Sequence, residues 1–327
     1  MQNGQRAMKP IVTLTVNPAI DASCLADEVI PMRKVRTREE RYDPGGGGLN
    51  VARVIHELGG EAVAFYLAGG LTGQALEGLI ERSGVAAVRV PVSGLTRVSH
   101  TVLETSTGHE FRFTPEGPVV EEAEWLNCLE VLSVIDGDYF VVSGSLARGM
   151  PADFYARVAK LVKARGGRVV LDSSGSPLHW ALQEGVWLVK PSRRELEHLL
   201  GRKVLTPQDE EALAREVVEQ GRAEIVALTL GTSGAVLATR DGALRLPSPK
   251  VDTKSAVGAG DSFVGAMVWA LAQGLPVEEA FAHGIAAGAA TAMTTGTELC
   301  RRADVERLYG EVAPLLPRRD DDAEVSI

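Results

Sequence analysis

The chain has 327 residues, 45% of them hydrophobic, and a formal net charge of −9. Because its acidic and basic residues are interspersed, the composition argues against nucleic-acid binding and favours a small-molecule partner. Its three cysteines lie far apart, and no CxxC or HExxH spacing occurs, so the sequence indicates neither a disulfide framework nor a zinc site. We find no signal segment and no apolar stretch long enough to cross a bilayer, which predicts a cytoplasmic protein without membrane contact.

Two polar β-like regions interrupt the first part of the chain. An apolar run at 11–16 predicts a strand, and residues 22–44 then form β-like pieces that are too charged for a core strand. Residues 96–115 contain a second such pattern, which is typical of a hairpin. We expect both regions to share one small sheet, which could act as a lid over an active site or pair with its own copy in a homodimer. A decorated edge of the main sheet is the alternative.

Four consecutive glycines, Gly45 to Gly48, precede Asn50 and an amphipathic helix that ends at Gly59-Gly60. Glycines let a ligand approach the backbone at a helix N-terminus, and Asn50 offers both a donor and an acceptor. A flexible linker would also be rich in glycine, but it would not lead directly into a capped amphipathic helix. We therefore favour ligand binding at this turn.

The rest of the chain alternates between apolar strands and helices. Strands are expected at 62–68, 139–143, 168–172, 186–189 and 225–230, and helices at 73–82, 121–134, 151–165, 193–200, 209–220, 258–273, 276–294 and 302–315. Such repeated βα units predict a mainly parallel sheet with helices on both faces, whose ligands bind beyond the carboxyl ends of the strands. The candidates at these ends are Asp21, Ser143-Gly144-Ser145, Asp172, Lys190-Pro191-Ser192 with Glu195, and Thr229-Leu230-Gly231.

The stretch Gly258-Ala259-Gly260-Asp261 follows a strand-like run that ends at Pro249 and precedes an apolar helical pattern. A glycine turn before a helix presents backbone amides and roughly half a positive charge to an anion. A carboxylate there would repel a bound phosphate, so we interpret Asp261 as a base that accepts a hydroxyl proton during phosphoryl transfer. An ordinary helix N-cap is an equally good interpretation of this stretch alone. No P-loop or GxGxxG motif occurs.

Together, segments 45–60 and 257–266 resemble the two signatures of the PfkB (ribokinase-like) carbohydrate kinase family, and the similarity covers nearly the whole chain. The resemblance implies an α/β fold of the ribokinase type: a mainly parallel central sheet flanked by helices, with a small β-sheet lid. We assign the kinase domain to residues 8–317 and interpret the charged end at 318–327 as a solvated tail. Further segments are most similar to the minor bacterial 6-phosphofructokinases, namely 17–21, 143–146, 172–175, 188–191 and 296–300.

This resemblance implies ATP-dependent phosphorylation of fructose 6-phosphate at its C1 hydroxyl, which forms fructose 1,6-bisphosphate in glycolysis, with Asp261 as the base. The activities of 1-phosphofructokinase and tagatose-6-phosphate kinase stay open as alternatives, because these relatives share much of the pattern. Outside enzymes, the alternative is a sugar-phosphate sensor. The retained Asp261 argues against a sensor, because a protein that only binds its ligand needs no base.

The resemblance also implies roles for single residues. The amides of Gly258, Ala259 and Gly260 would form an anion hole. The residues implied to bind the sugar phosphate are Asp21, Lys34, Arg36, Gly46, Gly47, Asn50, Arg97 and Ser145, with Lys34 and Arg97 on its phosphate and Arg36 reaching over from a dimer partner. Those implied to bind ATP are Lys190, Ser192, Thr229, Gly231 and Gly234. Glu195 would organise Mg²⁺ through water, and activation by K⁺ stays open.

Two positions depart from the family pattern. Ser192 stands where the family usually has the Asn of an Asn-x-x-Glu motif, and Ala256 stands where Thr is common. The shorter side chain of Ser192 predicts that metal and phosphate are organised more weakly there or through water. Neither departure removes the base.

Overall fold

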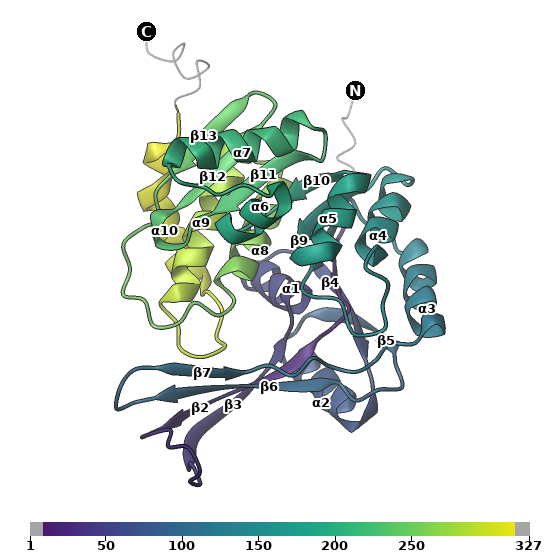
Figure 1. Cartoon of the computed structure of the whole chain (residues 1–327), viewed down its shortest axis with the longest axis vertical. Helices are drawn as coiled ribbons and strands as arrows, with labels where there is room; N and C mark the ends of the chain where they lie inside the picture. The colour runs from purple at the N-terminus through teal and green to yellow at the C-terminus, as the bar shows by residue number, and fades with distance from the viewer. Residues whose placement is uncertain (1–8, 318–327) are drawn as a thin grey trace.

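The computed structural model describes residues 9–317, and its centre is a nine-stranded sheet in the order β13-β12-β11-β10-β9-β8-β1-β4-β5 (Figure 1). The strands are β1 (Ile11–Thr15), β4 (Ala62–Ala68), β5 (Ala86–Pro91), β8 (Tyr139–Ser143), β9 (Arg168–Asp172), β10 (Val186–Val189), β11 (Ala223–Thr229), β12 (Ala235–Thr239) and β13 (Gly242–Leu246). Neighbours from β5 to β11 pair in parallel, whereas β12 and β13 pair antiparallel at one edge. The prediction of a mainly parallel sheet is confirmed.

Helices cover both faces of this sheet (Figure 1). They are α1 (Gly47–Glu57), α2 (Gly70–Arg82), α3 (Glu122–Ser133), α4 (Phe154–Lys163), α5 (Gly175–Glu184), α6 (Arg193–Leu200), α7 (Pro207–Glu219), α8 (Ala259–Ala272), α9 (Val277–Ala292) and α10 (Arg302–Val312). Alternate residues of each strand enter opposite layers, because successive side chains point to opposite faces. Phe65, for example, packs in the layer of α3 to α7, and its neighbour Tyr66 packs in the layer of α1, α2, α8 and α9. No helix between residues 9 and 317 has the length and hydropathy needed to span a membrane.

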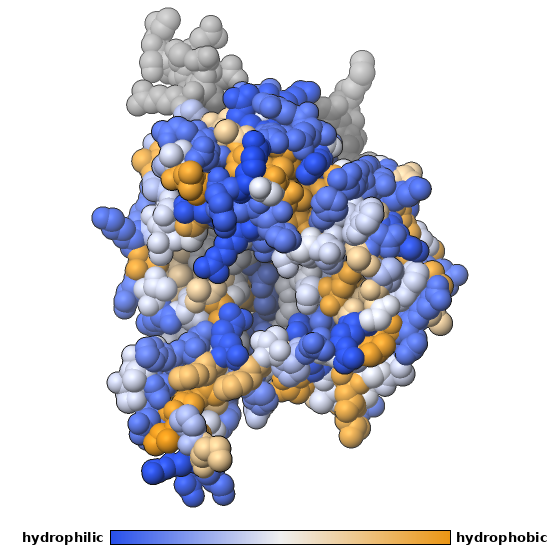
Figure 2. Space-filling view, in the orientation of Figure 1, coloured by the Kyte–Doolittle hydropathy of each residue, from blue (hydrophilic) through white to orange (hydrophobic). Residues whose placement is uncertain are grey.

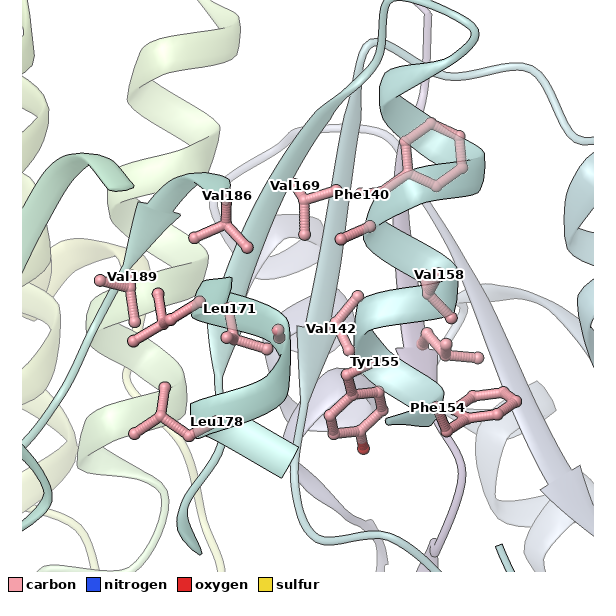
Figure 3. Close-up of a cluster of buried hydrophobic side chains, with 14 of the residues drawn as sticks. Phe140, Val142, Phe154, Tyr155, Val158, Val169, Leu171, Leu178, Val186 and Val189 are labelled. Atoms are coloured by element: carbon pink, nitrogen blue, oxygen red, sulfur yellow. The ribbon is translucent and has the colours of Figure 1, made fainter. Parts of the chain in front are cut away.

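Figure 3 shows part of the first layer, in which α4 and α5 pack against β8, β9 and β10. Phe154 and Val158 come from α4, Leu178 comes from α5, and all three side chains are almost fully buried. Val142 and Leu171 meet them from strands β8 and β9. Burial of this kind fixes the two strands, so the residues at their carboxyl ends are held in place.

The smaller sheet consists of β2 (Ala19–Ala26), β3 (Thr37–Gly45), β6 (Arg97–Glu104) and β7 (Glu110–Phe113), in the order β3-β2-β6-β7. Parallel pairing of β2 with β6 joins the two chain segments. The expectation that they share one accessory sheet is therefore confirmed. The sheet lies across one end of the body, and we call it the lid sheet (Figure 1).

Most predicted elements match the structure. Strands 139–143, 168–172 and 186–189 and helix 193–200 are observed with the predicted bounds. Strands β5 and β12 and helix α5 were not predicted from the sequence. Helix α5 begins at Gly175, which has a positive φ of 62°, and the Gly and Pro near its start read as a turn. The run expected to end at Pro249 ends at Leu246 instead. The tail predicted at 318–327 lies outside the described residues.

Candidate active site

A cavity of about 330 Å³ lies between the lid sheet and the carboxyl ends of the central strands. Ser143 is the last residue of β8, Asp172 is the last residue of β9, and both line the cavity. Figure 2 shows the surface hollowed between the lid sheet and the body. Most predicted sugar-binding and catalytic residues line this cavity together with the predicted magnesium residue Glu195; they are Asp21, Gly46, Gly47, Asn50, Arg97, Ser145, Gly258 and Asp261.

The glycine run brings the start of α1 into the cavity wall. Gly46 is the N-cap of α1 and has a φ of 111°, in the region that favours glycine. A Cβ atom at Gly47 would lie 2.1 Å from Ser143 Oγ, and one at Gly45 would lie 2.1 Å from the carboxylate of Asp21. Only glycine therefore lets these three parts of the chain approach so closely. The linker interpretation is wrong, because the run is packed and leads straight into the helix.

Asp261 is the third residue of α8, and its carboxylate faces the same cavity. The N-cap of this helix is Gly258, with a φ of 75°, so the N-cap interpretation of Asp261 is wrong. Instead, Asp261 Oδ2 accepts a hydrogen bond of 2.9 Å from Asn50 Nδ2. Burial, together with the nearby charge of Asp172, raises the pKa of Asp261 to about 7. A carboxyl group with this pKa can accept a proton near neutral pH.

A second cavity, of about 470 Å³, lies on the other side of the first turn of α8. Ala259 and Gly260 line it, whereas Gly258 and Asp261 line the first cavity. Its other walls contain three predicted nucleotide-binding residues and several apolar side chains, namely Thr229, Gly231, Gly234, Val251, Phe263, Ile285 and Ala289. The first-turn amides, which have no carbonyl partner within the helix, therefore stand between a polar cavity and a more apolar one.

Lys190 lines neither cavity but lies behind this turn. Its Nζ atom is 3.0 Å from Asp172 Oδ1, and both side chains are largely buried. Burial by itself would lower the pKa of Lys190, but the charge and hydrogen bond of Asp172 raise it above the ordinary value, so the amine stays charged. A Cβ atom at Gly260 would lie 3.5 Å from this Nζ. The ammonium group thus adds positive charge beside the amides of the turn.

The start of α6 places Glu195 in the wall of the first cavity. Ser192 is the N-cap: its Oγ accepts from the Glu195 amide at 3.3 Å, and Glu195 Oε2 accepts from the Ser192 amide at 2.7 Å. This capping box shows that Ser192 still holds the helix start although it lacks the amide usual in the family. Within residues 9–317, no group of three or more His, Cys, Asp or Glu side chains could hold a metal by itself. Glu195 fits a magnesium ion held mainly by phosphate oxygens and water.

Two predicted cations do not reach the cavity in the single chain. Lys34 and Arg36 lie on the exposed connection between β2 and β3. Arg97 does line the cavity, where it also donates to the carbonyls of Asn17 (2.8 Å) and Pro115 (3.0 Å). Arg112, which was not predicted from the sequence, lines the cavity as well and forms no salt bridge within residues 9–317. The pairing of β7 with β6 places Arg112 opposite Thr101, which also lines the cavity, so strand alternation identifies Arg112 once this pairing is known.

A buried carboxylate beside free helix amides, between two cavities, defines a site for transferring a phosphoryl group to an alcohol. Residues 12–304 match the pfkB family carbohydrate kinases. The chain belongs to this family, and its fold is that of the ribokinase-like α/β kinases.

Curated relatives agree with this assignment. The chain is 42% identical over 301 residues to an ATP-dependent 6-phosphofructokinase isozyme 2 of Mycobacterium tuberculosis, covering 91% of this chain and 88% of the relative. It is 36% identical over 304 residues to the isozyme 2 of Escherichia coli, covering 92% and 98%. The structure of E. coli phosphofructokinase-2 in complex with fructose-6-phosphate matches with a TM-score of 0.89 at 35% identity, covering 94% of this chain and all of that one.

Proposed function

We propose that the protein transfers the γ-phosphoryl group of ATP to the C1 hydroxyl of fructose 6-phosphate, forming fructose 1,6-bisphosphate and ADP. The observation that carries this proposal is the position of Asp261 and the first turn of α8 between the two cavities. Relatives named 6-phosphofructokinase, and the related structure that contains fructose-6-phosphate, support the choice of substrate. We place the reaction in glycolysis, in the cytoplasm.

The sugar phosphate occupies the first cavity in this proposal. Asp21, Asn50 and the backbone of Gly46 and Gly47 bind its hydroxyl groups. Asp261 accepts the proton of the C1 hydroxyl while that oxygen attacks the γ-phosphorus and ADP leaves. The amides of Gly258, Ala259 and Gly260 stabilise the charge on the transferred group.

The nucleotide occupies the second cavity, with its phosphates at the first turn of α8. Thr229, Gly231 and Gly234 line this cavity, and the small and apolar residues of α8 and α9 leave room for a flat base. Lys190 stabilises phosphate charge from behind the turn. Glu195 would hold the water shell of a magnesium ion, which would supply positive charge to the phosphates. We also propose a K⁺ site among backbone carbonyls near Ser255 and Gly296, since E. coli phosphofructokinase-2 has been solved with potassium.

Asp261 should give the reaction a characteristic pH dependence. A base must be ionised, and the pKa of Asp261 is raised to about 7, so kcat/KM should fall tenfold per pH unit below about pH 7. The hydrogen bond from Asn50 lowers that pKa, so Asn50→Ala should move the falling limb to higher pH. The phosphate of the substrate titrates at about pH 6 and would not respond to this substitution. A pH profile that stays flat from 6 to 8, or a limb that Asn50→Ala leaves in place, would contradict the role of Asp261.

We propose a homodimer formed through the outer face of the lid sheet. Residues that alternate with the cavity-facing ones form that face: the apolar residues Ala22, Tyr42, Val102, Phe111 and Phe113, with His100 between Ala22 and Phe113. Tyr42 and Phe113 are more than half exposed, at 55% and 56%. An apolar sheet face of this kind favours association, and a partner in this position could bring Lys34 or Arg36 to the substrate phosphate.

Phe113→Asp should convert the dimer to a monomer, because it places a charge in the apolar face. Leu205→Asp is the matched control, since Leu205 is an exposed apolar residue far from the lid sheet. Sedimentation velocity measures both. A wild-type monomer, or a Phe113→Asp variant that stays dimeric, would rule out this interface.

Phosphorus NMR of the wild-type reaction tests the proposed product directly. With magnesium, ATP and fructose 6-phosphate, we expect the ATP signals to give way to ADP signals as a second phosphomonoester resonance, on C1, appears. Loss of the γ-phosphate to inorganic phosphate alone would overturn the proposal.

A further inference from the structure

Strand β7 carries two charged side chains on the face that looks toward the body. Arg112 lines the first cavity, and Glu110 is two residues before it, so both project from the same side of the strand. Glu110 Oε2 accepts a hydrogen bond of 3.2 Å from Ser255 Oγ. The same lid strand therefore contacts the sugar cavity through Arg112 and the body through Glu110.

Ser255 lies on the loop that leads into α8. Its side chain is largely buried, and its Oγ accepts a hydrogen bond of 3.2 Å from the amide of Val257, the residue before the N-cap Gly258. It also lies 3.4 Å from the carbonyl oxygen of Gly296, in the loop after α9. Figure 1 shows both loops reaching down to β7. Ser255 thus connects the lid sheet with the backbone that forms the anion-binding turn.

The same loop builds a wall of the nucleotide cavity. The residues of this loop that line the cavity are Lys250, Val251, Thr253 and Ala256. They lie on both sides of Ser255, the residue that contacts Glu110. The loop contains no helix or strand between Leu246 and Ala259. Its position therefore depends on tertiary contacts: the amides of Lys254 and Ser255 donate to the carbonyl of Ala292 in α9, and Ser255 Oγ donates to Glu110 in β7.

A second connection between the lid sheet and the body differs in character. Asp43, at the end of β3, accepts a hydrogen bond of 2.7 Å from Thr297 Oγ1, and both residues are buried. Glu110, in contrast, is exposed and lies on a short strand at the free edge of the lid sheet. The contact between Glu110 and Ser255 can therefore form and break as the lid sheet moves.

We infer that Glu110 is a positioning residue that couples binding of the sugar phosphate to binding of the nucleotide. This inference rests on the proposed function and adds to it that Arg112, which lines the sugar cavity, binds the substrate phosphate. A phosphate held by Arg112 orders β7, which keeps Glu110 against Ser255 and fixes the loop that the nucleotide contacts. Nucleotide binding then costs less ordering of that loop, and by linkage the nucleotide strengthens sugar-phosphate binding by the same factor.

The test compares nucleotide affinity with and without the sugar phosphate. Titration calorimetry with Mg²⁺ and the non-hydrolysable analogue AMPPNP, with and without saturating fructose 6-phosphate, gives a ratio of two dissociation constants. For the wild type we expect a ratio of roughly 5 to 50, within the usual span of coupling between sites. Glu110→Ala should bring the ratio below about 2 while leaving affinity without sugar unchanged, a loss within that same span.

Two further variants separate positioning from a structural effect. Glu110→Gln should restore most of the ratio, because its amide oxygen can still accept from Ser255. Glu40→Ala should behave as wild type, because Glu40 is a lid carboxylate that accepts its hydrogen bond from Thr37 on the same strand. In turnover, Glu110→Ala should raise KM for ATP at saturating sugar phosphate by more than it lowers kcat.

The inference is overturned if the wild-type ratio is one, if Glu110→Ala keeps the wild-type ratio, or if it weakens nucleotide binding equally with and without sugar phosphate. Failure of the proposed function would look different. In that case the wild type would not turn over fructose 6-phosphate at all, whatever residue stands at 110.

Discussion

Asp261→Asn should lower kcat by roughly two to four orders of magnitude, the usual contribution of a positioned base. The amide cannot take the proton of the attacking hydroxyl, but it can still accept the hydrogen bond that Asn50 donates at this position. The cavities and the first turn of α8 should therefore persist, and KM for ATP should change little. Steady-state kinetics with purified variant and wild type measures both quantities. Near-normal turnover would contradict the assignment of the base.

The same substitution should stabilise the fold at high pH, which distinguishes a lost base from a damaged protein. The pKa of Asp261 is raised to about 7 in the folded chain, against about 3.9 when unfolded. Its protonated form therefore favours the folded state below pH 4, and that contribution is lost as pH rises through 7. The variant has no charge to bury, so its Tm should exceed that of wild type at pH 8 and approach it near pH 4. A lower Tm at pH 8 would indicate a structural defect.

Arg112→Ala should raise KM for fructose 6-phosphate by roughly 10- to 100-fold, because a hydrogen bond to a charged group contributes about 1.5–3 kcal/mol. Arg112 lines the sugar cavity and forms no salt bridge within the part of the chain that the structure describes, so it is available to a substrate phosphate. The value of kcat should fall much less, since the phosphate is remote from the C1 hydroxyl. Initial-rate measurements over a range of fructose 6-phosphate concentrations separate the two parameters.

Unphosphorylated fructose provides the control, because it offers Arg112 no anion. The variant and the wild type should therefore show similar kcat/KM with fructose, while they differ with fructose 6-phosphate. An equal loss of kcat/KM with both sugars would place Arg112 in a structural role.

Lys34→Ala tests a contribution from a dimer partner. If Lys34 acts across a dimer, its variant should also raise KM for fructose 6-phosphate, and Phe113→Asp should reproduce that effect.

The sequence was sufficient to predict the arrangement of the site along the central sheet. Apolar strands alternating with helices define a parallel sheet, so Ser143, Asp172 and Lys190 had to meet at one edge of it. The two glycine stretches also allowed a prediction, because glycines before a helix commonly let a ligand approach the first backbone amides of that helix. In the structure, Gly46 and Gly258 are the N-caps of α1 and α8, and both have a positive φ.

It could not be predicted in the same way which cationic residues of the lid sheet face the cavity. Lys34 and Arg112 are both charged residues in polar β regions, and their surroundings depend on which strands pair. The parallel pairing of β2 with β6 turns Asp21, Ser99 and Arg97 toward the cavity, and no local pattern specifies that long-range pairing. The part of the nucleotide-cavity wall between residues 247 and 258 was missed for a related reason. Residues 247–258 have no periodicity, so their place depends on tertiary contacts such as those of Ser255.

The most direct test of the account is an ADP-release assay with magnesium and ATP against fructose 6-phosphate, fructose 1-phosphate, tagatose 6-phosphate, fructose and ribose. The account predicts the highest kcat/KM for fructose 6-phosphate. A preference for fructose 1-phosphate would contradict the proposed substrate and support the activity of relatives such as the 1-phosphofructokinase of Bacillus subtilis, to which the chain is 31% identical. Binding without turnover of any sugar would contradict catalysis itself and support a sugar-phosphate sensor.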